Sequence, residues 1–199
     1  MEISVIITNY NYEKYIARSI RSVLNQSFNK NEYEILVVDD CSTDNSKNII
    51  SSFGGKIKNV YNEQNLGLAA SCNKTIQSAM GKFFIRLDAD DYVCRDWLLI
   101  LHCFISNNKD DMDSISSDYL LVNEKETTIA RKNAITWPIA CGILFKTDDF
   151  IQLGGYNEQL KREDEDFRNR FLKSGKHIYN VPIPLYRYTQ HELSLTKNL

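Results

Sequence analysis

The sequence lacks the features that would staple a small secreted protein or hold a chain in a membrane. Its five cysteines are scattered, without a C-x-x-C pair or a histidine at zinc-finger spacing, so we expect reduced thiols and no structural zinc. No stretch approaches the roughly 20 apolar residues of a membrane-spanning helix. Residues 1–4 lack the basic start of a secretion signal. We therefore expect a cytoplasmic protein that at most reaches the inner face of a membrane.

An excess of charge of one sign is also missing. The chain has 24 lysines and arginines against 26 acidic residues, a net charge of -2, and its basic clusters are short. This argues against a basic face that binds DNA or RNA. No repeat, low-complexity tract or linker divides the 199 residues, and a chain of this length can bury a sizeable core. We expect a single domain over residues 1–199.

Apolar runs alternate with helical repeats through the first half of the chain. A strand buried on both faces is predicted at residues 3–8 and a second buried strand at residues 35–38. Further strands are predicted at residues 57–61 and 83–87. Helices are predicted over residues 16–24, from a capping start at residues 42–44, and after Asn65 to about residue 80. This alternation predicts an α/β fold with a doubly wound, mostly parallel sheet flanked by helices. Because such sheets bind ligands at the carboxyl ends of their strands, the loops after Thr8, Val38 and Leu87 should line one crevice.

The second half shows a weaker pattern. A helix is predicted over residues 97–105, and residues 119–122 and 127–130 flank a turn that predicts a small antiparallel element at the sheet edge. The remaining predicted elements are strands at residues 139–145, 178–181 and 185–188, and helices from residues 147–149 and over 164–174.

The strongest local signal is Asp88-Ala89-Asp90-Asp91, directly after an apolar strand. In extended backbone the carboxylates of Asp88 and Asp90 face the same way and can jointly hold a hard divalent ion. Mg²⁺ or Mn²⁺ suits few carboxylates, with substrate phosphates completing its coordination, and would neutralise a leaving diphosphate. The alternative interpretation is a solvated acidic turn. The position of the motif directly after a buried strand argues against that alternative.

Two further acidic clusters accompany this signal. Asp39-Asp40 ends the second predicted strand, and residues 163–166 open the late helix. A turn cap is the alternative for the first cluster, and a helix cap favoured by the helix dipole is the alternative for the second. Asp39-Asp40 and Asp88-Ala89-Asp90 are expected at the same sheet edge, where their repulsion would be costly without a cation.

Six motifs occur together in one order along the chain. They are Thr8-Asn9-Tyr10-Asn11, Val37-Val38-Asp39-Asp40-Cys41-Ser42-Thr43-Asp44, Asn65-Leu66-Gly67, Leu87-Asp88-Ala89-Asp90-Asp91, Gly154-Gly155-Tyr156 and Glu163-Asp164-Glu165-Asp166. From residue 3 to about 195, the combination resembles a family 2 glycosyltransferase of the GT-A fold. The resemblance implies an inverting, metal-dependent enzyme that transfers a sugar from a nucleoside-diphosphate sugar to a hydroxyl acceptor. It favours a UDP-sugar, a glycan or lipid-linked acceptor, and a role in bacterial-type surface polysaccharide synthesis.

The resemblance also implies roles for individual residues. Asp164 matches the general base that deprotonates the acceptor hydroxyl, and Glu163 orients the acceptor or supports that base. Asp90 would be the main ligand of Mn²⁺ or Mg²⁺, together with Asp88. His191 is a further candidate ligand, with an isolated surface histidine as the alternative. Donor contacts are implied for Thr8, Asn9, Tyr10, Asp39, Asp40, Asn65, Gly67, Asp88, Ala89 and Arg187. Residues 1–91 would form the nucleotide-binding half and residues 92–199 the acceptor-binding half.

Two departures from the family pattern bear on function. Cys72 stands before Asn73 where many relatives carry an arginine, which leaves donor affinity and base preference open. The chain stops at Leu199 without the carboxyl-terminal extension of many relatives, which favours transfer of one sugar over processive polymerisation. Peripheral membrane association and a homodimer are left open.

Two other functions are considered. A degenerate domain would bind a nucleotide or a partner without turnover, but intact Asp88, Asp90 and Asp164 argue against it. A nucleotidyltransferase would also use an α/β sheet and carboxylate-bound metal. It usually needs a glycine- and lysine-rich phosphate loop near the first strand, which residues 8–11 do not offer.

Overall fold

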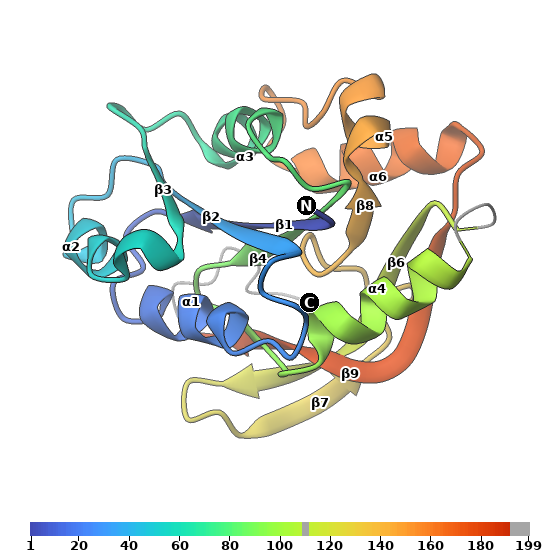
Figure 1. Ribbon diagram of the computed structural model, residues 1–199, viewed down its shortest axis with the longest axis horizontal. Coiled ribbons are helices and arrows are strands. Elements are labelled where there is room, and N and C mark those ends of the chain that lie inside the picture. The colour runs from blue at the N-terminus through green and yellow to red at the C-terminus, as the bar shows by residue number, and fades with distance from the viewer. Residues whose placement is uncertain (109–111, 192–199) are drawn as a thin grey trace.

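The computed structural model describes residues 1–108 and 112–191, and it forms one curved sheet between two layers of helices (Figure 1). The strands are β1 (Ile3–Asn9), β2 (Tyr33–Asp39), β3 (Lys58–Tyr61), β4 (Phe83–Asp88), β5 (Tyr92–Val93), β6 (Ser114–Asn123), β7 (Thr128–Lys132), β8 (Leu144–Lys146) and β9 (Ile178–Gln190). The α-helices are α1 (Ile16–Leu24), α2 (Ser46–Ser51), α3 (Leu68–Gln77), α4 (Trp97–Asn107), α5 (Thr147–Gln152) and α6 (Glu163–Lys173).

The sheet joins a parallel half to a mixed half. Its strands run in the order β3-β2-β1-β4-β8-β6-β9-β5, and the first four are parallel to one another. β8 pairs antiparallel with both β4 and β6, while β7 forms an antiparallel hairpin with the second part of β6. The predicted α/β class, the mostly parallel first half and the small antiparallel element are confirmed.

The two faces of β1 show why helices cover the sheet on both sides. Ile3, Val5 and Ile7 pack into the core that contains α1 and α4, whereas Ile6 faces the core that contains α3, α5 and α6. Side chains alternate between the faces of a strand, so a continuous apolar run needs apolar cover on both. Figure 1 shows α1 and α4 on one side of the sheet and α3, α5 and α6 on the other.

Two predicted strands differ from the structure. Residues 139–143 form a buried loop, and only Leu144–Lys146 pairs with the sheet. Gly142 has a φ of 75°, a left-handed conformation outside the strand region, and a Cβ there would lie 3.0 Å from the ring of Tyr186. Residues 139–143 are therefore apolar because they are buried, although they do not belong to a strand.

The two short strands predicted at residues 178–181 and 185–188 are one continuous strand, β9. It pairs in parallel with β6 along nearly its whole length, and the register shifts around Asp118, opposite Pro184. Proline cannot donate a ladder hydrogen bond, so the bulge accommodates the proline segment between the two predicted strands. Within residues 1–108 and 112–191, no helix has the length and apolar character needed to cross a membrane.

Candidate active site

The acidic motifs converge at the carboxyl ends of three adjacent strands. In the parallel register, Asn9 of β1 lies opposite Asp39 of β2, and Thr8 lies opposite Asp88 of β4. Because β1 lies between β2 and β4, the Asp39-Asp40 and Asp88-Ala89-Asp90 motifs flank it at one sheet edge. The predicted juxtaposition of the two acidic motifs is therefore what the fold produces.

Asp39 and Asp40 hold the loops around this edge. Oδ1 of Asp39 accepts hydrogen bonds from Asn9 Nδ2 at 2.7 Å and from Ser42 Oγ at 2.6 Å. Asp40 accepts from Asn62 Nδ2 at 2.8 Å and from the backbone N–H of Gly67 at 2.8 Å. Both carboxylates are buried, and these hydrogen bonds hold the loops in place.

The remaining predicted donor contacts differ in exposure. Thr8 and Ala89 are buried, whereas Tyr10 and Asn65 are exposed at the edge of the site. Oδ1 of Asn9 is buried and accepts no hydrogen bond from a described residue, so this edge retains an open acceptor. Arg187 donates to the backbone oxygens of its own strand at Pro184 and Tyr186.

Three carboxylates gather in the loop after β4. Oxygen atoms of Asp88, Asp90 and Asp91 lie within 4.8 Å of one another. Asp91 is fully engaged, since its oxygens accept the hydroxyl of Tyr186 at 2.6 Å and the backbone N–H of Thr189 at 2.7 Å. Asp91 therefore fastens β9 to the loop, and leaves Asp88 and Asp90 as the half-buried pair that suits a cation.

The protein environment opposes the charge on this loop. Burial first, and then the negative charge of Asp88, raise the pKa of Asp90, while its hydrogen bond with His191 acts in the opposite direction. Burial and the charges of Asp90 and Asp88 also raise the pKa of Asp91 well above its ordinary value. A divalent ion would favour the ionised carboxylates and relieve this repulsion.

His191 is not an isolated surface residue. It is buried, with Nε2 2.8 Å from Oδ2 of Asp90, and its ring stacks on Tyr15 with centroids 4.8 Å apart. Tyr12 adds an edge contact to the same ring. The surface alternative is wrong, because His191 is buried and the two tyrosines, from the segment before α1, enclose its imidazole.

Arg18 is a site residue that the sequence reasoning missed. Its Nη2 donates to the backbone oxygen of Asp90 at 2.6 Å and to Oγ1 of Thr189 at 2.9 Å. Its Nη1 lies 3.3 Å from Glu126, in the turn between β6 and β7. The guanidinium therefore holds the acidic loop against β9, a role that no local pattern in α1 reveals.

Arg86 joins the acidic loop to α6. Its guanidinium is buried, with Nε 3.1 Å from Oδ1 of Asp88 and Nη1 3.3 Å from Oε1 of Glu163. Burial raises the pKa of the nearby Cys72 thiol to about 12, and the positive charge of Arg86 opposes that shift. A charged side chain inside an apolar strand was the available signal for this residue.

Helix α6 begins with two acidic residues, Glu163 and Asp164, that lie on different faces of the helix. Glu163 faces Arg86, while Asp164 shares a helix face with Arg168, four residues on. Nη2 of Arg168 donates to the backbone oxygen of Ile139 at 3.0 Å. Burial lowers the pKa of Arg168, and the negative charge of Asp164 opposes that shift. Asp164 therefore lies on the side of α6 that faces the buried loop before β8.

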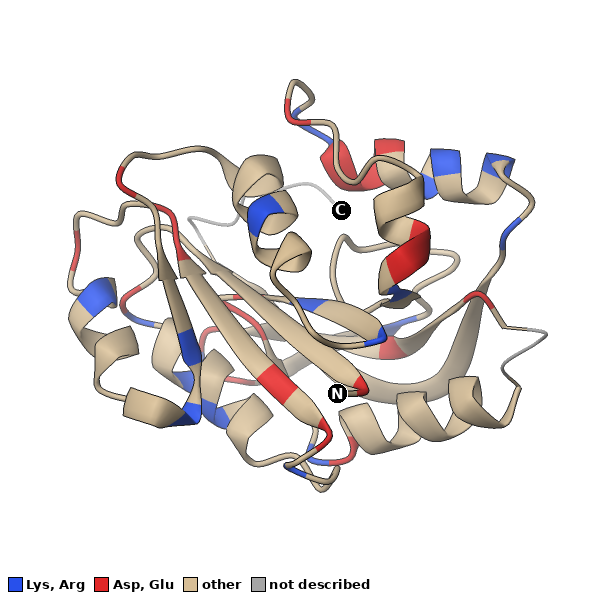
Figure 2. Cartoon of the chain, turned by 45° about the horizontal axis from the view of Figure 1, so that its top comes forward, with Lys and Arg blue, Asp and Glu red and all other residues tan. Residues whose placement is uncertain are grey.

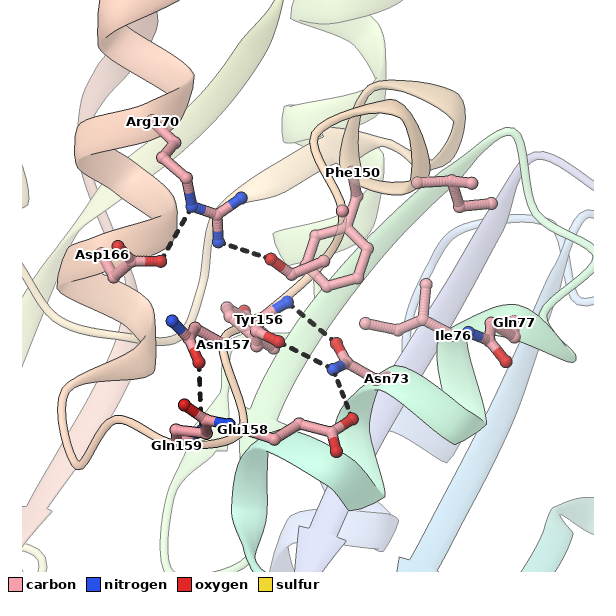
Figure 3. Close-up of a pocket in the computed structure, with 13 residues that line it drawn as sticks. Asn73, Ile76, Gln77, Phe150, Tyr156, Asn157, Glu158, Gln159, Asp166 and Arg170 are labelled. Carbon is pink, nitrogen blue, oxygen red and sulfur yellow. Dashed lines mark hydrogen bonds and ion pairs between the residues drawn. The ribbon is translucent and has the colours of Figure 1, made fainter.

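A separate groove lies on another face of α6. It has a volume of about 660 Å³ and is lined by parts of α3, α5 and α6 and by the Gly154-Gly155-Tyr156 segment. Figure 3 shows that Asn73 bonds to the backbone of Tyr156 and that Asp166 pairs with Arg170. None of the predicted site residues lines it.

Comparison with known proteins places this geometry in a family. The family model described as "Glycosyl transferase family 2" matches residues 4–170. The poly(ribitol-phosphate) beta-N-acetylglucosaminyltransferase TarS of Staphylococcus aureus is 34% identical over 128 residues, which cover 63% of this chain and 21% of that protein. An uncharacterized glycosyltransferase of Haemophilus influenzae is 35% identical over 185 residues, which cover 92% of this chain and 56% of that protein.

A solved structure agrees with these matches. The structure of Staphylococcus aureus TarS 1–349 in complex with UDP-GlcNAc superposes with a TM-score of 0.87 at 25% identity, covering 100% of this chain and 61% of that one. The chain thus spans less than two thirds of the length of these relatives. The match over residues 4–170 nevertheless contains every acidic motif of the site. The chain belongs to glycosyl transferase family 2.

Proposed function

We propose that the chain is the catalytic domain of a metal-dependent, inverting glycosyltransferase that uses a UDP-sugar as donor and a hydroxyl group as acceptor. The observation that carries the proposal is the bridge formed by Arg86 between Asp88 and Glu163. It couples the carboxylates suited to a metal and diphosphate to the helix that carries Asp164. The complex of TarS with UDP-GlcNAc supports uridine as the base.

The reaction is a single displacement. The acceptor oxygen forms a bond to the anomeric carbon while the bond from that carbon to the diphosphate oxygen breaks. The electron pair of the broken bond stays on the diphosphate, and the acceptor proton passes to the carboxylate of Asp164. Attack opposite the leaving group inverts the anomeric configuration.

The environments of Glu163 and Asp164 support this division of roles. Glu163 is buried and paired with Arg86, so its carboxylate is held as part of the framework. Asp164 is half-buried and makes no hydrogen bond with a described residue, which leaves its carboxylate available for a proton. We assign Asp164 as the general base and Glu163 as its support.

The carboxylates of Asp88 and Asp90 fit Mn²⁺ or Mg²⁺, because both are oxygen ligands in a loop whose burial already opposes uncompensated charge. When bound, the ion would supply Lewis-acid stabilisation of the leaving diphosphate. His191 completes the proposed set, next to Asp90. The buried open acceptor of Asn9 supports a contact with the nucleotide from the adjacent strand end.

We assign the donor to residues 1–91 and the acceptor to the half from residue 92 onward. The relatives named above include an enzyme that acts on poly(ribitol phosphate), which supports a role in surface polysaccharide synthesis with a glycan or lipid-linked acceptor. Such an acceptor would place the protein in the cytoplasm at the inner face of the membrane.

Calorimetric titration with UDP, UDP-GlcNAc, UDP-glucose and GDP-mannose tests the proposal, each with Mn²⁺, with Mg²⁺ and with EDTA. We expect a uridine ligand to bind with metal and to lose at least tenfold in affinity with EDTA. Binding of GDP-mannose alone would overturn the donor assignment. Absence of binding to all four ligands would favour the non-catalytic alternative.

A further inference from the structure

The turn before β8 presents an exposed aromatic side chain on a well-built loop. Trp137 is 48% exposed and Ile135 is 50% exposed, although both lie between buried residues of the same core. The backbone around them is held by Asn133, whose Oδ1 accepts the N–H groups of Ile135 and Thr136 at 2.9 and 3.2 Å. Exposed apolar side chains on a turn with a fixed backbone are typical of a binding surface.

Buried groups fix the position of Trp137 itself. Its backbone oxygen accepts the hydroxyl of Tyr119 at 3.1 Å, and its N–H donates to the oxygen of Asn133 at 2.9 Å. Nζ of Lys132 lies over the indole ring, 4.0 Å from its centroid. The ammonium therefore lies against one face of the ring, while the residue as a whole remains 48% exposed.

The loop that carries Trp137 is continuous with the candidate active site. The backbone oxygen of Ile139, two residues after Trp137, accepts a hydrogen bond from Arg168. Arg168 lies on the face of α6 that also carries Asp164. The N–H of Gly142 donates to the backbone oxygen of Arg86 at 3.0 Å. Cys141, in the same loop, is buried. One loop therefore contacts both the strand of the proposed metal site and the helix of the proposed base.

We propose that Trp137 is an acceptor-binding residue, on whose indole a sugar ring of a glycan acceptor stacks. The inference rests on the proposed function, and deepens it by naming a residue that selects the acceptor. A pyranose has an apolar C–H face and an equatorial rim of hydroxyls, so it suits an exposed aromatic face with polar neighbours. The Lys132 ammonium, 4.0 Å from the ring centroid, is the polar neighbour.

The test uses the two tryptophans of the chain, Trp97 and Trp137, labelled as 5-fluorotryptophan and assigned with the Trp137→Phe variant. The protein, with UDP and Mn²⁺ present, is titrated with chitotriose, cellotriose, maltotriose and mannotriose. We expect at least one trisaccharide to shift the Trp137 signal and leave that of the fully buried Trp97 unchanged. Trp137→Ala should lose at least tenfold in affinity for that sugar, measured by calorimetry, while Trp137→Phe stays within threefold.

Phe104→Ala is the matched control, because Phe104 is an exposed aromatic residue on α4. It should leave the sugar affinity unchanged. All variants should bind UDP as the parent chain does, so a loss confined to the trisaccharide separates this inference from the donor site. If UDP fails to bind the parent chain, the proposed function fails, and the fluorine shifts still report on Trp137. The inference would be overturned if no trisaccharide shifted the Trp137 signal. It would also be overturned if phosphatidylglycerol vesicles, added in a parallel titration, shifted that signal and no trisaccharide did.

Discussion

The imidazole of His191 lies 2.8 Å from the carboxylate of Asp90, although 101 residues separate them along the chain. The histidine follows the end of β9, and the aspartate follows the end of β4. Tyr12 and Tyr15, from the segment before α1, enclose the imidazole. Three distant segments therefore build the proposed metal site, and its acidic part alone is contiguous in sequence.

Replacement of His191 by alanine should weaken Mn²⁺ binding by about 10- to 100-fold, whether the imidazole is a ligand or orients Asp90. Calorimetric titration of the protein with Mn²⁺ in the presence of UDP measures this change. His177→Ala is the control, because the side chain of His177 is 72% exposed and pairs with Asp113 away from the acidic loop. Equal Mn²⁺ affinity in the parent chain and His191→Ala would remove His191 from the site.

Asp90→Ala and Asp164→Asn should separate binding from transfer. Asp90→Ala should abolish the metal-dependent part of UDP-GlcNAc affinity, because it removes the main proposed oxygen ligand. Asp164→Asn should keep that affinity within about threefold and lower the rate of sugar transfer by about 10²- to 10⁴-fold, the range expected for loss of a general base. Calorimetry and the release of UDP measure the two effects. If both variants lose binding equally, the proposed division of roles is wrong.

Arg86→Met should destabilise the fold by about 3–5 kcal/mol, because it leaves the buried carboxylate of Glu163 without its partner. Urea unfolding followed by circular dichroism measures the free energy. Arg162→Met is the matched control, since Arg162 pairs with Glu165 on the exposed side of α6 and should change stability by less than about 1 kcal/mol. A double variant, Arg86→Met with Glu163→Leu, should recover part of the loss.

Cys72→Arg should be poorly tolerated. Cys72 is fully buried against Arg86, so a second guanidinium there would meet a like charge in a closed core. We expect a loss of about 3 kcal/mol or more in unfolding free energy. Combining Cys72→Arg with Arg86→Leu should restore stability, because a single cation then faces Glu163. A stable single variant would show that the core beside Arg86 accepts a second guanidinium.

Local patterns were sufficient for the parallel half of the sheet. The apolar runs of β1, β2 and β4 are long enough to need cover on both faces, and the polar residues that follow them mark the strand ends. Asn9, Asp39 and Asp88 meet because parallel neighbours end at the same edge. That much follows from strand order and period alone.

The strands of the mixed half are harder to predict from local sequence patterns, because they depend on partners that are distant in the chain. Residues 139–143 are as apolar as a strand, yet a left-handed glycine directs them into a loop. β9 crosses a proline segment without ending, since a bulge in its pairing with β6 absorbs the missing donor.

The sequence by itself determined the α/β class, the carboxyl edge of the sheet and the acidic motifs that gather there. Only the tertiary structure decided which charges are paired. Arg86 faces Glu163 across 77 residues, and Arg18 holds the backbone of Asp90 across 72. The reason is that local patterns encode which face of an element is buried, whereas ion pairs in a core depend on how those faces pack.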